Sequence, residues 1–281
     1  MIPILTKKTA DKILKAKAGK GAIEVTVSLD LGLSSSKVIV EGESVIIDRI
    51  KIALSDIKRI KEDFCYYLND GKLEKVAFFS PESNLYYKLS ATKDWPTIKL
   101  SSVPMHRHIK ISPKEDTETK IKEIMPVKGT VLDTCCGLGY TAIMASNQPD
   151  AVKVDVFERD DYVLHIAGLN PYSQALFSSK KIELHKEDVS KGIKKFKDES
   201  FDKIIHDPPT FRISPDLYYP AFYKQLYRVM KKGGILYHYA PNPGKTKGNE
   251  FYKLIIRTLM ESTKFKDIEY HEASSGIRAV K

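Results

Sequence analysis

Short runs of alternating apolar and polar residues dominate the first 112 residues. Between Ile23 and Leu29 every second residue is apolar, the pattern of a strand with one buried face. Asn69-Asp70-Gly71 separates two apolar runs and predicts a hairpin turn. Further short strands are expected at 37–40, 44–47, 64–68, 73–79 and 85–89. A Lys-rich helix is expected at 6–18, and Ser55 is expected to cap a helical turn that runs to Lys61. This pattern predicts a small β-rich domain at 1–112.

From residue 113 onward, predicted strands alternate with helices. Apolar strands are expected at 131–134, 152–157, 182–184, 201–206 and 235–240, and a closing antiparallel pair at 268–271 and 277–280. Helices are expected at 141–147, 161–169, 221–230 and 249–262, with Lys231-Lys232-Gly233-Gly234 ending the third. The alternation predicts an α/β domain at 113–281 with a mostly parallel sheet, which binds ligands at the carboxyl ends of its strands.

The first predicted strand of this domain leads into a glycine-containing turn. It ends at Asp133, and the chain then passes through Gly137 and Gly139 into a helix. A strand, a tight turn and a helix N-terminus let backbone N–H groups approach a ligand closely. The third glycine of a dinucleotide fingerprint is missing, as is the Gly-Lys-Ser/Thr ending of a P-loop. The turn therefore does not favour a pyrophosphate ligand.

Acidic residues follow the next two strands as well. Glu158 comes 25 residues after Asp133, where an α/β nucleoside site places a carboxylate that accepts hydrogen bonds from the ribose hydroxyls. Asp188 follows the third strand. Either acid alone is most often a solvated strand-end carboxylate, but both in register with Asp133 indicate a nucleoside site.

The fourth strand ends in Asp207-Pro208-Pro209-Thr210-Phe211. The two prolines stiffen the backbone and remove two N–H donors, which leaves the Asp207 carboxylate and the Pro208 carbonyl as acceptors. A pair of acceptors suits a target that is a planar amine. His206 precedes the motif and is expected to point away from Asp207 into the core.

Together, the glycine turn, Glu158, Asp188 and the Asp-Pro-Pro motif resemble the motifs of class I S-adenosylmethionine (SAM)-dependent methyltransferases, in the order typical of that family. The resemblance implies a Rossmann-like, seven-stranded domain and SAM as cofactor. The Asp-Pro-Pro motif is similar to the Asp-Pro-Pro-Tyr motif of enzymes that methylate exocyclic amines of bases. In those enzymes two acceptors hold the amine hydrogens and aim the nitrogen at the sulfonium methyl. Thr210 replaces the usual aromatic residue here, and Phe211 follows it.

This resemblance implies two sets of site residues. The catalytic set is Asp207, Pro208 and Pro209. The cofactor-binding set is Asp133, Cys135, Gly137, Gly139, Tyr140, Glu158, Arg159, Asp188, Val189 and Asp207. Cys135 and Cys136 are expected to be packing groups under the cofactor, because N-methylation needs no thiol nucleophile. No metal is expected, because the sulfonium supplies the electrophile.

A looser resemblance extends over the whole chain. The β-rich domain, the Met-His-Arg junction and the Cys-Cys-Gly-Leu-Gly-Tyr turn are similar to an archaeal family associated with N4-methylation of cytidine in ribosomal RNA. The implied function is methylation of an exocyclic base amine. The substrate-binding residues are then expected to be Thr210 and Phe211 of the motif, with His106 and Arg107 at the junction and Lys245 after the fifth strand as candidate phosphate contacts; a solvated linker and a solvated loop remain the alternatives for these last three.

Two alternatives to RNA base methylation remain open. One is methyl or aminopropyl transfer to a protein amide, a small amine or a polyamine, or methylation of a transfer RNA guanosine or adenosine. The other is an RNA-binding scaffold that has lost its activity. The target nucleotide, the number of methyl groups added, the form of the RNA substrate and the oligomeric state are left open.

Charge and cysteine content bear on partners and location. The formal net charge is +10, and residues 1–112 hold 19 Lys and Arg against 13 Asp and Glu. This surplus predicts that the β-rich domain binds RNA. Only three cysteines occur, and no run of about 18 apolar residues is present. A cytoplasmic protein with no membrane partner is therefore expected.

Overall fold

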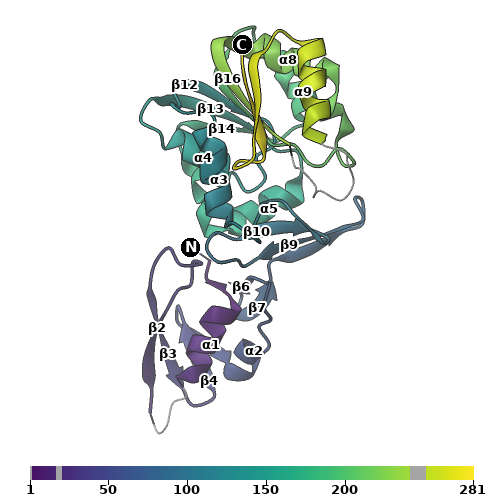
Figure 1. Cartoon of the computed structure of the whole chain (residues 1–281). Helices are drawn as coiled ribbons and strands as arrows, with labels where there is room; N and C mark the ends of the chain where they lie inside the picture. Colours follow the sequence, from purple (N-terminus) through teal and green to yellow (C-terminus); the bar gives the residue numbers. More distant parts are fainter. Residues whose placement is uncertain (1, 17–20, 241–250) are drawn as a thin grey trace. The chain divides into compact units, whose positions relative to one another are not determined.

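The computed structural model describes residues 2–16, 21–240 and 251–281 (Figure 1). The chain divides into two compact units, each described here by itself. The first unit comprises 1–114 together with 165–174, and the second comprises 115–164 and 175–281. Residues 165–174 belong to the first unit through contacts such as His165 with Phe78, whose ring centroids are 4.8 Å apart, and Tyr172 with Trp95, at 5.5 Å.

Three small antiparallel sheets build the first unit. The four-stranded sheets are β2 (Ile23–Val27), β3 (Ser36–Glu41), β4 (Ser44–Ile47) and β5 (Ile50–Ala53), and β11 (Val103–Pro104), β10 (Thr97–Leu100), β9 (Leu85–Ser90) and β8 (Ala77–Ser80). The three-stranded sheet is β1 (Ile4–Leu5), β6 (Tyr66–Asn69) and β7 (Lys72–Lys75). Helices α1 (Lys7–Lys15) and α2 (Leu54–Lys58) cover the apolar core with Ile13 and Ile57.

Some local predictions in this unit are wrong in detail. Asp70 and Gly71 do form the turn between β6 and β7, with positive φ angles of 45° and 81°. The expected strand at 73–79, however, is split between β7 and β8, which lie in different sheets. Ser55 caps no helix, because α2 begins one residue earlier and its N-cap residue is Ala53.

The second unit is built on a seven-stranded sheet with the order β14-β13-β12-β15-β16-β18-β17. Its strands are β12 (Gly129–Asp133), β13 (Ala151–Phe157), β14 (Ile182–His185), β15 (Phe201–His206), β16 (Met230–Tyr239), β17 (Lys266–His271) and β18 (Gly276–Val280). The first five in spatial order are parallel, and β18 runs antiparallel to both of its neighbours. This confirms the predicted α/β class with a Rossmann-like, mostly parallel sheet.

Helices connect and cover these strands. They are α3 (Pro113–Lys122), α4 (Tyr140–Ser146), α5 (Asp161–Leu169), α6 (Gln174–Ser178), α7 (Val189–Gly192), α8 (Pro220–Val229) and α9 (Phe251–Ser262). Leu226 of α8 and Leu259 of α9 pack with Ile204 and Leu236 of the sheet in one apolar core. Among the described residues, no helix is long and apolar enough to cross a membrane.

The segment Lys231-Lys232-Gly233-Gly234 does not end a helix as predicted. Helix α8 ends at Val229, and the segment lies inside β16. Phe201 pairs with Met230, and Lys203 pairs with Ile235. Residues 231–234 of β16 therefore lie opposite a single residue of β15. Gly233, with a φ of 73°, allows this irregularity of the ladder.

Candidate active site

The carboxyl ends of neighbouring parallel strands form one edge of the second unit's sheet. Asp133, the last residue of β12, pairs with Val156 of β13 on one side and with Ile205 of β15 on the other. The segments that follow these strands, including Glu158 and Asp207, therefore start next to one another. This is the edge at which α/β sheets bind ligands.

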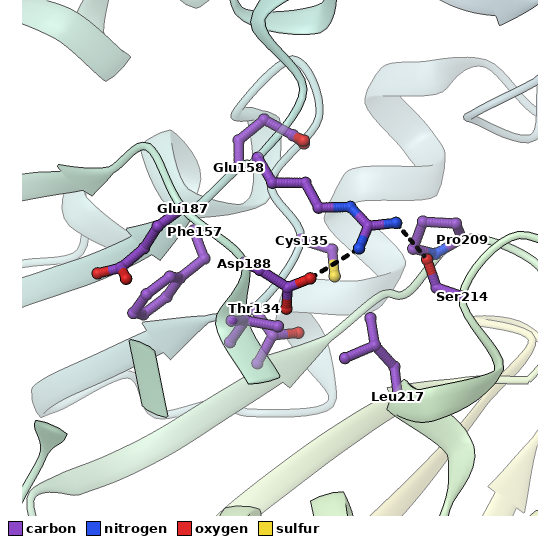
Figure 2. Close-up of a pocket in the computed structure, with 11 residues that line it drawn as sticks. Thr134, Cys135, Phe157, Glu158, Glu187, Asp188, Pro209, Ser214 and Leu217 are labelled. Atoms are coloured by element: carbon purple, nitrogen blue, oxygen red, sulfur yellow. Dashed lines mark hydrogen bonds and ion pairs between the residues drawn. The ribbon is translucent and has the colours of Figure 1, made fainter. Parts of the chain in front are cut away.

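A small cavity of about 50 Å³ lies at this edge (Figure 2). Its lining combines predicted cofactor residues with one proline of the Asp-Pro-Pro motif: Cys135, Glu158, Arg159, Asp188, Val189 and Pro209. Pockets for small molecules usually measure ~300–1,000 Å³. A nucleoside can therefore enter only if the cavity widens.

The side chain of Arg159 links two walls of this cavity. Its Nη1 donates to Asp188 Oδ2 at 2.7 Å, and its Nη2 donates to Ser214 Oγ at 3.2 Å (Figure 2). Asp188 is also the N-cap residue of α7 and accepts from the Ser190 N–H. Burial raises the pKa of Asp188, but the hydrogen bonds from Ser190 and Arg159 outweigh it and hold that pKa below its ordinary value.

The glycine turn is bound to Glu158. The Gly137 N–H donates to Glu158 Oε2 at 3.0 Å, while Oε1 accepts from the Asp160 N–H. Gly139 is the N-cap residue of α4, with a φ of 77°, and a Cβ there would lie 2.9 Å from Leu176. Burial raises the pKa of Glu158 to about 7. The Glu158 carboxylate thus both lines the cavity and binds the backbone of the glycine turn.

Asp133 and Tyr140 flank the glycine turn in the sequence, and both are buried. Asp133 is fully buried and accepts the Thr141 hydroxyl at 2.6 Å, which ties the end of β12 to the start of α4. Burial raises its pKa to about 7. Tyr140 is 2% exposed. Neither residue lines the cavity, and neither do Gly137 and Gly139.

The Asp-Pro-Pro motif lies just beyond β15 and contacts a buried lysine. Asp207 Oδ2 accepts from Lys120 Nζ at 2.7 Å, and Lys120 also forms an ion pair with Asp116. Both partners come from α3. The sequence does not mark Asp116 and Lys120 as buried, because an acid and a lysine four residues apart on a helix are the usual sign of a solvated face.

An aromatic cluster follows the motif. Phe211 is 44% exposed, and its ring centroid lies 5.7 Å from that of Tyr218 and 6.2 Å from those of Tyr219 and Phe251. Tyr218 also donates its hydroxyl to the Pro209 carbonyl at 2.8 Å. Thr210 is exposed. The exposed aromatic face next to the motif thus comes from Phe211 together with Tyr219, which is 49% exposed.

Three predicted substrate residues lie outside the described part of the second unit. His106 and Arg107 lie in the first unit, where His106 Nδ1 is 3.0 Å from Thr97 Oγ1. Lys245 lies outside the described residues. His206 is a core residue, as the strand pattern predicted, because it is fully buried with Nδ1 2.8 Å from Thr134 Oγ1.

Burial of the two cysteines of the turn disfavours their thiolate forms. Burial raises the pKa of the Cys135 and Cys136 thiols well above their ordinary value, so both stay protonated at neutral pH. This agrees with their predicted packing role. The third cysteine, Cys65, is fully buried in the first unit.

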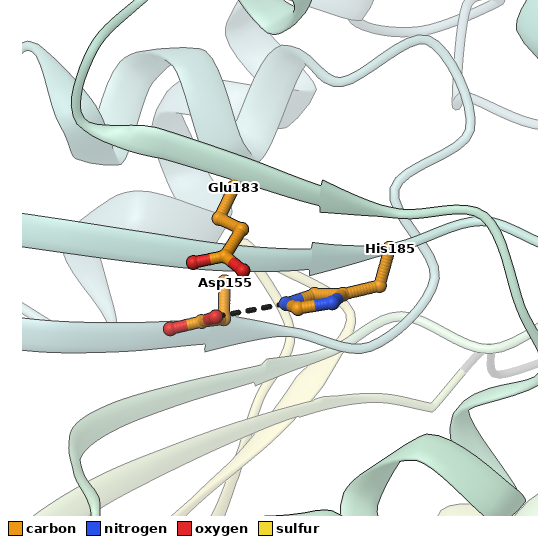
Figure 3. A group of neighbouring side chains, drawn as sticks. All are labelled: Asp155, Glu183 and His185. Atoms are coloured by element: carbon orange, nitrogen blue, oxygen red, sulfur yellow. Dashed lines mark hydrogen bonds and ion pairs between the residues drawn. The ribbon is translucent and has the colours of Figure 1, made fainter.

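A separate polar group lies on β13 and β14. Asp155, Glu183 and His185 place their ligand atoms close together, and His185 Nε2 is 2.8 Å from Asp155 Oδ1 (Figure 3). The ammonium of Lys153 lies between the two carboxylates, 2.9 Å from Asp155 and 2.5 Å from Glu183. A lysine therefore already supplies the positive charge that these acids attract.

Comparison with known proteins places this fold in a family. Residues 117–246 match the family described as "Methyltransferase small domain". Protein MJ1233 of Methanocaldococcus jannaschii, described as uncharacterized, is 38% identical over 99% of this chain and 95% of its own length. The chain belongs to the same family as MJ1233. The domain match supports the prediction of a SAM-dependent transferase, whereas the description of MJ1233 names no activity.

Other relatives are described as aminopropyltransferases. The polyamine aminopropyltransferase of Prochlorococcus marinus (strain MIT 9312) is 27% identical over 51% of this chain, which spans only 51% of that protein. A crystal structure of spermidine synthase in complex with the transition state analogue AdoDATO superposes with a TM-score of 0.58. It is 17% identical, and the match covers 72% of this chain and 71% of the other. At this identity the likeness shows the fold alone.

Proposed function

We propose that this protein transfers a methyl group from SAM to an exocyclic amine of an RNA base, with cytidine N4 of ribosomal RNA as the first target to test. One observation carries the proposal. Pro209 of the Asp-Pro-Pro motif lines the same cavity as Glu158 and Asp188, so the motif that holds the predicted amine acceptors reaches the site of the predicted nucleoside-binding acids.

The lining of the cavity fits the nucleoside part of SAM. Glu158 would accept hydrogen bonds from the ribose hydroxyls, and Asp188 and Val189 would contact the adenine. The carboxylate of Glu158 is buried. It suits neutral hydroxyl donors, because these need only acceptor oxygens and no solvated charge. When bound, SAM supplies an electrophilic methyl group on sulfur. Arg159 must swing away from Ser214 to admit it.

The Asp-Pro-Pro motif supplies acceptors for the amine. Asp207 accepts an N–H of the target, and the Pro208 carbonyl accepts the other. Bound SAM would supply the methyl carbon to which the nitrogen lone pair forms a bond as the carbon–sulfur bond breaks, and one proton would leave the nitrogen to water. Positioning of this kind is worth several powers of ten in rate.

The aromatic cluster and the net charge support RNA as the substrate. Stacking of a base on an exposed aromatic ring contributes ~1–3 kcal/mol, and Phe211 offers such a ring next to the motif. The net charge of +10 favours a polyanion.

The comparisons favour a second candidate, aminopropyl transfer from decarboxylated SAM to a polyamine. A relative described as a polyamine aminopropyltransferase and a spermidine synthase structure both match the chain. These matches support a small amine better than they support an RNA base.

One assay separates the two candidates. The purified protein is incubated with SAM or decarboxylated SAM, and each donor is offered ribosomal RNA, transfer RNA and putrescine. We expect N4-methylcytidine in ribosomal RNA digests, detected by mass spectrometry of nucleosides. Product only with decarboxylated SAM and putrescine would overturn the proposal and establish the second candidate.

A further inference from the structure

A buried group of three charged side chains reaches the proposed amine site at one end. Lys120 Nζ lies 2.7 Å from Asp207 Oδ2 and 2.9 Å from Asp116 Oδ2. The side chains of Lys120 and Asp116 are 2% and 0% exposed, whereas that of Asp207 is 21% exposed. Only the Asp207 end of the group is therefore accessible to a substrate.

We propose that Lys120 is a positioning residue that holds Asp207 as an ionised acceptor and restricts the site to uncharged amines. Asp116, one helical turn before Lys120 on α3, orients the ammonium. The inference rests on the proposed function in one respect, namely that Asp207 receives the target amine.

Lys120 is a permanent cation in this setting. Burial alone would lower its pKa, but the charges of Asp207 and Asp116 and their hydrogen bonds raise it above its ordinary value. The ammonium also lies 4.9 Å from the centroid of the Tyr239 ring, a distance at which the ring face attracts a cation.

Among the residues that the structure describes, the other titratable groups named here around Asp207 carry no positive charge. They come from three sides: Asp116 on α3, Asp133 and Cys135 at the end of β12, and Tyr218 and Tyr239 beyond β15 and on β16. Among these described neighbours, Lys120 supplies the charge that balances the carboxylates.

This arrangement suits a base amine and not an alkyl amine. A base amine is uncharged and needs only acceptors, and a carboxylate offers about four acceptor positions, so it can bind Lys120 and an amine together. An alkyl ammonium would bring a second positive charge beside Lys120 and would have to lose a proton first. A carboxylate that is bonded to a cation is a weak base for that step.

The first test uses two variants and a matched control. Lys120→Met leaves the acids without a cation, which favours the protonated form of Asp207. We expect its methylation of RNA at pH 7 to fall at least about tenfold, and its pH optimum to rise by about one unit or more. Lys120→Arg keeps the charge and should retain the wild-type pH optimum. Arg257→Met, which breaks an exposed ion pair with Glu261 on α9, should change neither quantity.

The second test measures charge selectivity. The double variant Asp116→Asn, Lys120→Met removes one charge of each sign, so it should fold even if Lys120→Met alone does not. Calorimetry should show that it binds putrescine at least about tenfold more tightly than the wild type does. Equal putrescine affinity, or an unchanged pH optimum in a folded Lys120→Met protein, would overturn the role of Lys120.

The failure of this inference and that of the proposed function can be told apart. If the wild type methylates no RNA yet binds putrescine more weakly than the double variant, the RNA target is wrong and the role of Lys120 stands. If the wild type methylates RNA and the putrescine affinities are equal, the target stands and the role of Lys120 is wrong.

Discussion

The backbone N–H of Gly137 donates to the carboxylate of Glu158 across 3.0 Å, so the glycine turn and the expected ribose acceptor are one bonded unit. A change in the protonation of Glu158 therefore acts on the cofactor pocket directly. Because burial raises the pKa of Glu158 to about 7, this change falls near neutral pH.

The affinity for SAM should depend on pH through Glu158. Ribose hydroxyls donate best to an ionised carboxylate, so affinity should rise as the pH increases toward 7 and level off above it. Below pH 7 the dissociation constant should increase by up to about tenfold per pH unit, the limit for one linked proton. Calorimetry from pH 5.5 to 8.5 measures this. Glu158→Gln should bind SAM more weakly and lose the dependence, and a variant that keeps it would assign the proton elsewhere.

Asp207→Ala should abolish methylation while leaving SAM affinity within about threefold, because Asp207 does not line the cofactor cavity. The variant also leaves Lys120 with one carboxylate fewer. Removing one partner of a buried ion pair costs ~3–5 kcal/mol, and the 21% exposure of Asp207 places the expected loss near the lower end. Urea denaturation measures that loss. Methylation at the wild-type rate would exclude Asp207 as the amine acceptor.

Phe211→Ala should weaken RNA binding without affecting SAM. Loss of one stacked base corresponds to ~1–3 kcal/mol, or roughly a tenfold to hundredfold increase in the KM for RNA. Phe177→Ala is the matched control, because Phe177 is 46% exposed and Phe211 is 44% exposed. If both variants bind RNA equally well, Phe211 has no stacking role.

Gly139→Ala should destabilise the second unit and weaken SAM binding. The new Cβ would lie 2.9 Å from Leu176, at a φ of 77° that side chains rarely adopt. Such strain costs ~1–3 kcal/mol. Gly168→Ala serves as the control, because nothing lies within 4 Å of its Cβ position and it lies inside α5. Thermal unfolding compares the two, and equal midpoints would contradict the expected strain.

The parts of the site that could be predicted are those set by local order along the chain. In a parallel sheet, strand ends meet at one edge, so the positions of Asp133, Glu158 and Asp207 follow from the strand pattern. The sequence leaves open whether Phe211 stacks on a base, and the structure shows that its ring is exposed. These inferences need no knowledge of how distant segments pack.

What could not be predicted depends on tertiary contacts. In the sequence, Lys120 and Asp116 have the spacing of an ordinary surface pair. They are buried because α3 packs near the end of β15. The link from Arg159 to Ser214 joins residues 55 positions apart. Likewise, residues 73–79 contribute to strands of two different sheets. The alternation of apolar and polar residues within seven positions does not reveal this division.

The assignment of 165–174 to the first unit has a consequence for dissecting the molecule. The polypeptide passes between the units three times, at 114, 164 and 174. A single cut near residue 114 therefore cannot release two whole units, since the carboxyl-terminal fragment would retain Tyr172, whose ring centroid lies 5.5 Å from that of Trp95. During synthesis, moreover, the amino-terminal half would have to wait for residue 174 to leave the ribosome before its own fold could close.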